Sequence, residues 1–140
     1  MALGFYTSSA EDFADAGWDW VADTINLLIM TSTYTFSAAH AFRDAITNEV
    51  SGTGYSSGGL ALDNKSASAA NPCVLSADDE VIAQSGAGFA DGEEYALSKI
   101  LGGASSADPL LCHGVAAGAF GNVAGQLTMA VPASFITITV

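Results

Sequence analysis

The chain has 140 residues, half of them hydrophobic and only 13% charged, and its 15 acidic residues outnumber three basic ones to give a net charge of −12. This length is typical of one domain with its own hydrophobic core, so we expect residues 1–140 to form a single domain. A surface so poor in Lys and Arg repels phosphate groups, which argues against direct binding to nucleic acid or to a membrane surface. The apolar content is too high for a disordered acidic chain, so the sequence predicts a folded protein.

Neither an export signal nor a membrane-spanning segment is expected. Residues 1–30 contain no Lys or Arg, whereas a secretory signal needs a basic start before an unbroken apolar stretch. The longest apolar runs, 25–30 and 135–140, have the length of strands rather than the roughly 20 residues of a spanning helix. Without a signal for an oxidising compartment, Cys73 and Cys112 are expected to be buried reduced thiols.

The first expected element is a short helix near the N-terminus. Ser8 and Glu11 have the spacing of a capping box. Residues 10–16 can form two turns, with Phe13 as the inward anchor. Gly17 follows, where a left-handed residue often ends a helix.

A buried strand is expected next. Residues 24–30 form a β-branched and apolar run of strand length. Residues 37–46 have apolar side chains at mixed spacing, which fits either a helical turn or an irregular connection. Residues 49–59 are rich in glycine but lack the lysine of a P-loop and the flanking strand and helix of a dinucleotide-binding loop. We interpret them as a turn in which glycines supply positive φ.

Short apolar segments separated by Gly, Ser, Asp and Pro fill the rest of the chain. They lie at 60–62, 73–75, 81–83, 95–101, 110–115, 127–131 and 135–140. The last segment alternates large apolar residues with Thr, and we expect it to pair within a sheet. This pattern predicts a mainly β fold: a β-sandwich, either jelly-roll or immunoglobulin-like, with a short N-terminal helix.

Candidate metal ligands are present but poorly spaced. Residues 78–80 and 91–94 are acidic clusters that lack the EF-hand pattern, and we interpret them as solvated turns. His40 and His113 could form a zinc site with the two cysteines. Structural zinc ligands usually come in pairs two to four residues apart, whereas Cys112 and His113 are adjacent and would point to opposite faces of a strand. We therefore expect no metal and no cofactor.

Catalytic patterns are equally weak. A small hydrolase could use Cys112 or a serine with His40 or His113, since only spatial proximity is required. However, no nucleophile elbow of the Gly-x-Ser-x-Gly kind occurs, and a chain of this length leaves little room for a cleft between paired carboxylates. We expect a non-enzymatic protein with an interface as its functional surface.

Two blocks of sequence carry a family resemblance. Residues 23–35 read DTINLLIMTSTYT, His40 follows, and residues 48–62 read NEVSGTGYSSGGLAL. In this order they resemble small virion structural proteins of tailed bacteriophages, over about residues 23–62. The segment 36–39 is more apolar than the turn that often leads to the His in such proteins.

The resemblance implies a capsid cement or decoration protein, made in the host cytoplasm and located on the outer capsid surface of the virion. Its implied partners are the major capsid protein and further copies of itself, as a homodimer or homotrimer at a symmetry axis. A tail, head-fibre or baseplate component is the alternative, for example an adhesin that binds host glycans with calcium on the 78–94 carboxylates. Aromatic residues are enriched at interface hot spots, and the candidates here are Trp18, Trp20, Tyr34, Phe36, Phe42 and Tyr55. For any single one of them, a position in the core is the favoured interpretation.

Overall fold

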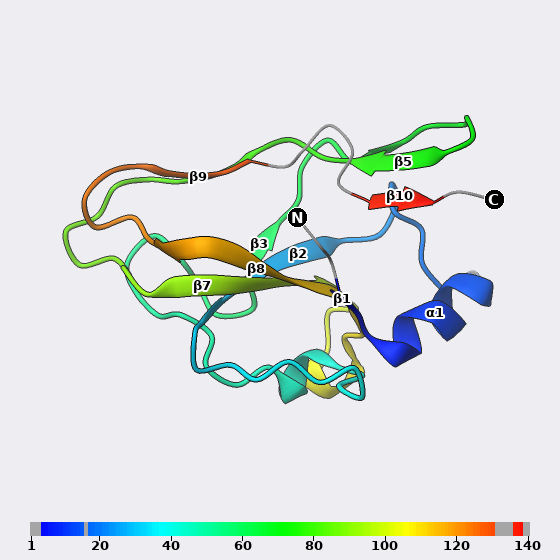
Figure 1. Ribbon diagram of the computed structural model, residues 1–140, viewed down its shortest axis with the longest axis horizontal. Coiled ribbons are helices and arrows are strands. Elements are labelled where there is room, and N and C mark those ends of the chain that lie inside the picture. The colour runs from blue at the N-terminus through cyan, green and yellow to red at the C-terminus, as the bar shows by residue number, and fades with distance from the viewer. Residues whose placement is uncertain (1–3, 16, 131–135, 139–140) are drawn as a thin grey trace.

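A computed structural model describes residues 4–15, 17–130 and 136–138 of the chain, and these residues form a mainly β structure (Figure 1). The elements in chain order are β1 (Gly4–Phe5), α1 (Thr7–Ala14), β2 (Ile25–Thr31), the 3₁₀ turn η1 (Arg43–Ala45), β3 (Leu60–Ala61), β4 (Ser66–Ala67), β5 (Cys73–Ser76), β6 (Glu80–Ile82), β7 (Gly92–Lys99), the 3₁₀ turn η2 (Ser105–Ala107), β8 (Leu110–Phe120), β9 (Leu127–Met129) and β10 (Ile136–Ile138). In this part of the chain, neither α1 nor the 3₁₀ turns approach the length of an apolar helix that crosses a membrane.

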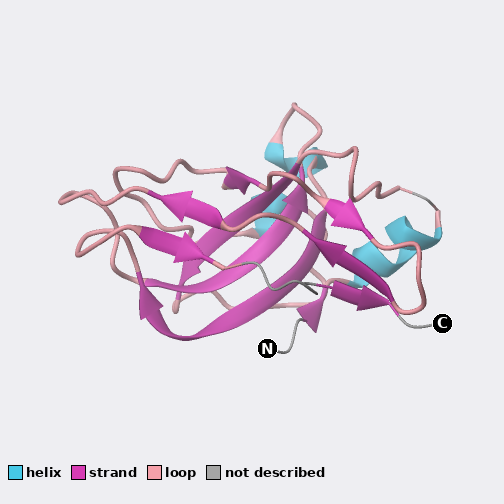
Figure 2. Cartoon of the chain, turned by 90° about the horizontal axis from the view of Figure 1, so that it is seen from above, coloured by secondary structure: helices cyan, strands magenta, loops and turns pink. Residues whose placement is uncertain are grey.

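A five-stranded antiparallel sheet forms the centre of the molecule. Its order is β1-β8-β7-β2-β3, and β2, β7 and β8 lie side by side as long curved strands (Figure 2). Two smaller sheets, β10-β5-β4 and β6-β9, are also antiparallel. The predicted mainly β class is therefore confirmed.

Both faces of β2 are covered, which explains its apolar run Leu27–Met30, since a strand buried on two faces does not alternate with polar residues. On one face, Ile25 and Leu27 pack with Trp20, Leu75 and Ile136. Farther along the same face, a second cluster contains Ile29, Val50, Tyr55, Ile82 and Phe89. On the other face, Leu28 and Met30 pack with Tyr6, Tyr34, Ala96 and Leu110. The central strand thus separates two apolar layers.

The N-terminal helix differs in detail from the prediction. It spans Thr7–Ala14, so Ser8 lies inside the helix and is not its N-cap. The amide of Gly17 donates to the carbonyl of Asp12 at 2.7 Å, which satisfies a carbonyl at the C-terminal end. The side chain of Phe13 and the whole of residue 16 lie outside the described part. In Figures 1 and 2, α1 lies at the same end of the molecule as β10.

The later apolar segments form strands whose bounds are shifted. The predicted terminal strand is present as β10, whose Ile136 and Ile138 lie opposite Leu75 and Cys73 of β5. Its flanking residues 135 and 139–140 lie outside the described range. The interpretation of residues 91–94 as a solvated turn was wrong, because β7 begins at Gly92 and includes Glu94.

Candidate functional site

Most of the aromatic interface candidates lie in the core of the chain. Trp18, Trp20, Tyr34 and Tyr55 are at most 9% exposed, while Phe36 is partly buried against the Tyr6 cluster. Phe42 is 42% exposed. The alternative core interpretation therefore holds for four of the six, and Phe42 is the candidate that faces solvent.

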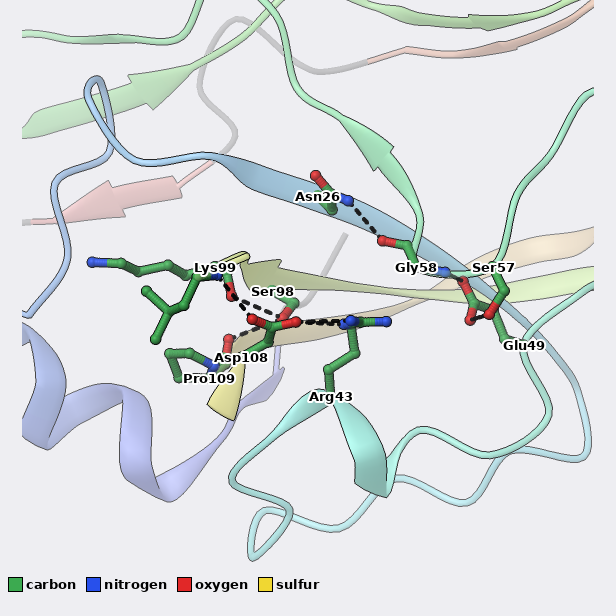
Figure 3. A network of polar contacts seen from close by, with 10 residues as sticks. Asn26, Arg43, Glu49, Ser57, Gly58, Ser98, Lys99, Asp108 and Pro109 are labelled. Carbon is green, nitrogen blue, oxygen red and sulfur yellow. Dashed lines mark hydrogen bonds and ion pairs between the residues drawn. The ribbon is translucent and has the colours of Figure 1, made fainter. Parts of the chain in front are cut away.

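The glycine-rich segment is organised by one carboxylate, that of Glu49. Its Oε2 accepts the hydroxyl of Ser57 and its Oε1 accepts the amide of Gly58, both at 2.9 Å (Figure 3). Oε1 also accepts the hydroxyl of Tyr55 at 2.6 Å. The Tyr55 oxygen in turn accepts the amide of Ile29 at 3.0 Å. Glu49 therefore fastens the segment to β2, and burial raises the pKa of Tyr55, so that its hydroxyl stays a donor.

The predicted use of glycine in this segment is confirmed. Gly54, Gly58 and Gly59 have positive φ. A Cβ on Gly59 would lie 2.6 Å from the carbonyl oxygen of Leu27, so β2 passes too close for any side chain. These contacts indicate that residues 49–59 form a structural turn held against β2, which we call the clamp, rather than a phosphate-binding loop.

The two histidines take part in a cluster that the sequence did not reveal. The hydroxyl of Tyr34 lies 2.9 Å from Nδ1 of His40 and 3.2 Å from the hydroxyl of Tyr6. The His113 ring stacks on Phe36 with 4.6 Å between centroids, and its Nε2 lies 2.6 Å from Oε2 of Glu94. Four parts of the chain supply these side chains: Tyr6 before α1, residues 34–40, β7 and β8.

The side chains of this cluster pack against one another, and its tyrosines are uncharged. Burial raises the pKa of Tyr34 and of Tyr6, so both phenols remain neutral. Cys112 packs on the opposite sheet face from His113, as its adjacency predicts, and burial raises its pKa to about 12. A Cys112–His113 pair is therefore not formed. Cys73 and Cys112 are both free thiols.

The acidic clusters do not converge on one site. Glu94 binds His113, whereas Asp78 accepts the side-chain amide of Asn64 at 2.6 Å. Burial, with the neighbouring charges of Asp63 and Asp78, raises the pKa of Glu80. Within the described ranges, no three His, Cys, Asp or Glu side chains are grouped to hold a metal ion.

All three cationic side chains make internal contacts. Arg43 donates through Nε and Nη2 to Oδ2 of the buried Asp108, at 3.0 and 2.8 Å (Figure 3). Lys99 Nζ donates to the carbonyl of Gly17 at 2.7 Å and pairs with Asp23 at 2.8 Å. Lys65 Nζ donates to the carbonyl of Leu62 at 3.1 Å. The surface charge is thus overwhelmingly acidic.

A cleft of about 410 Å³ lies between α1 and the loops that carry Phe42 and Leu101. We call it the α1 cleft. Its lining residues include Glu11 and Asp12 of α1, with Ala41, Phe42, Leu101 and Pro109 opposite. Apolar walls beside carboxylates make this cleft the candidate contact site, and of the predicted interface residues it contains Phe42.

Comparison with protein-family models, with curated proteins and with solved structures finds no match for this chain. The resemblance of residues 23–62 to phage virion proteins accordingly stays a prediction.

Proposed function

We propose that this chain is a non-enzymatic structural protein of a tailed-bacteriophage particle, a cement or decoration protein that binds the outer surface of the capsid shell. The observation that carries the proposal is the resemblance of two sequence blocks, which turn out to be neighbours in space. Val50 donates its amide to Ile29, and Leu60 of β3 lies opposite Leu27 of β2. The two blocks therefore behave as one structural unit, as expected of a motif shared by a family for its fold.

The side chains that could have served catalysis support the same proposal. Glu49 fastens a turn, Glu94 binds His113, and the Cys112 thiol lies in the core. Glu49 closes a local turn and Glu94 joins β7 to β8, which are roles expected in a protein that must be rigid rather than reactive.

We propose the finer architecture as an incomplete β-sandwich. The large sheet is one layer, and β5 and β10 with the β6-β9 pair form the other (Figure 1). Leu97 of β7 packs in one cluster with Leu75 of β5 and Ile136 of β10. At the other end of the space between the two layers, Ile29 of β2 packs in one cluster with Ile82 of β6. A core between two sheets is the defining feature of a sandwich.

Binding to a shell needs no deep pocket, so the modest α1 cleft is sufficient for it. The major capsid protein presents the same surface many times, and further copies of the chain at a symmetry axis would let weak contacts add by avidity. The acidic outer surface would keep the particle from adhering to nucleic acid.

Particles assembled with and without this chain test the proposal. We expect particles that lack it to release DNA at a lower temperature, measured with an intercalating dye during heating, and to regain the original temperature when purified protein is added back. Equal release temperatures, together with no binding of added protein, would contradict a cement role.

A further inference from the structure

We propose that the α1 cleft binds a cationic side chain, arginine or lysine, that is flanked by an apolar residue in a segment of another protein. The inference rests on the proposed function only for the identity of that protein, which would be the shell. The site itself follows from the apolar and charged groups that line the cleft.

The apolar part of the cleft is exposed and aromatic. Phe42 is 42% exposed and Leu101 is 57% exposed, although both are large hydrophobic residues. Ala41 and Pro109 continue this wall. The aliphatic stem of a Lys or Arg packs on such a surface, and its charged head is attracted to the face of a phenylalanine ring.

The charged part of the cleft is negative. Glu11 and Asp12 lie on the α1 side. Lys99 also lines the cleft, but its ammonium already contacts Asp23 and the Gly17 carbonyl. An entering N–H donor therefore meets the carboxylates of Glu11 and Asp12, of which Asp12 also accepts the indole N–H of Trp18 at 3.4 Å.

A second copy of the chain is a poor occupant. The sequence has only three cations. Arg43 pairs with the buried Asp108, Lys99 pairs with Asp23, and the Lys65 ammonium donates to the Leu62 carbonyl. A neighbouring copy would have to break one of these internal contacts to insert a cation. Charge complementarity therefore points to a different protein that presents Lys or Arg.

The test uses the full-length chain, isotope-labelled for NMR, titrated with the capped tripeptide Leu-Arg-Leu. The matched probe replaces arginine with citrulline, which keeps the shape but removes the charge. We expect the arginine peptide to shift amides of residues 8–17, 41–42 and 99–109, with binding that weakens as salt is raised. The citrulline peptide is expected to bind about two- to fivefold more weakly.

Two variants and two controls localise the effect. The double variant Glu11→Gln with Asp12→Asn, and separately Phe42→Ala, should each weaken binding several-fold. As controls, Asp78→Asn with Asp79→Asn also removes two carboxylate charges, and Val81→Ala also truncates a hydrophobic side chain. Both change exposed residues outside the cleft and should leave binding unchanged. All four sets retain the core, and their amide spectra report directly whether the fold is intact.

Three results would overturn the proposal: no shifts of cleft amides up to about 10 mM peptide, equal binding of both peptides, or equal loss in the controls. Shifts caused by unlabelled chain alone would assign the cleft to self-association instead. Particle binding is measured separately. A cleft variant that binds particles as tightly as the original chain would show that the cleft does not bind the shell, and would leave the proposed function intact. A chain that binds the peptide but not the particles would support the cleft as a binding site and contradict the proposed function.

Discussion

Gly59 shows how tightly the glycine-rich segment is held against β2. Its φ is +85°, and an added Cβ would approach the Leu27 carbonyl oxygen to 2.6 Å. We expect Gly59→Ala to destabilise the fold by at least about 2 kcal/mol, because strain and a backbone clash add. Gly86 is the control, since a Cβ there meets nothing within 4 Å. Urea unfolding measures both, and equal midpoints for the two variants would refute the clamp.

Asp108 is the most deeply buried charge in the polar network of Figure 3. It is 0% exposed, accepts twice from Arg43, and receives the Leu101 amide at 2.8 Å. Asp108→Asn leaves the Arg43 guanidinium without its counter-charge, so we expect a loss of about 2–3 kcal/mol in unfolding free energy. Asp44→Asn, at an exposed neighbour of Arg43, should change it by less than about 0.5 kcal/mol. A loss below about 1 kcal/mol for Asp108→Asn would show that the pair contributes little.

Residue contacts of this kind were the least predictable from the sequence. Arg43 and Asp108 are separated by 65 positions, and His113 meets Phe36 only after β8 is placed in the sheet. No local pattern marks such partners. By contrast, the glycine turn was predictable, because positive φ is a property of the single residue.

At the scale of elements, the side chain of Ile136 packs β10 into the core. Ile136 is 4% exposed and packs in the cluster that contains Leu75 and Leu97. Ile136→Ala should lower the unfolding free energy by about 2–4 kcal/mol, as expected for a fully buried aliphatic side chain. Val81→Ala, at a residue that is 55% exposed, is the matched control. A small effect at Ile136, similar to that at Val81, would mean that the strand is not needed for the core.

The turn at residues 19–23 is attached to β7 by Lys99. Burial raises the pKa of Asp23, but the hydrogen bond and charge of Lys99 and the amide of Asp19 outweigh it, so the net shift is downward. A lowered pKa adds stability above the unfolded-state value, and this stability is lost as the pH falls through the folded-state value.

Lys99→Met should therefore cost about 1 kcal/mol at neutral pH and less below the ordinary Asp value of 3.8. Part of the cost remains at low pH, because the bond from Lys99 to the Gly17 carbonyl is also removed. Chemical unfolding at pH 7 and pH 3 measures the difference. A cost that is the same at both pH values would contradict the assigned role of Asp23.

Strands made of apolar runs were predictable from the sequence. A strand that contains a charged side chain was missed, because the partner of that side chain lies far away in the sequence. Residues 24–30 were expected as a buried strand because they form a β-branched and apolar run of strand length. Residues 110–115 were expected as one of several short apolar segments separated by turn residues. Residues 91–94 were misinterpreted since two adjacent glutamates resemble a solvated turn. Glu94 instead lies in β7, where His113 of the neighbouring strand β8 is the partner of its carboxylate.

At the scale of the whole molecule, the excess of acids takes on a specific meaning. Because Arg43, Lys65 and Lys99 all point to internal partners, almost no positive charge is left to oppose the surface carboxylates. Such a surface disfavours phosphate and favours a basic protein partner. Exposed apolar side chains, among them Phe42 and Leu101, give that partner something to bury.

Copy number in a purified particle tests the central claim most directly. Quantitative mass spectrometry, with the major capsid protein as the internal standard, gives the ratio of this chain to shell subunits. A cement protein predicts a fixed ratio that corresponds to hundreds of copies per particle. A handful of copies would place the chain in a fibre or baseplate, and its absence from purified particles would contradict a virion role altogether.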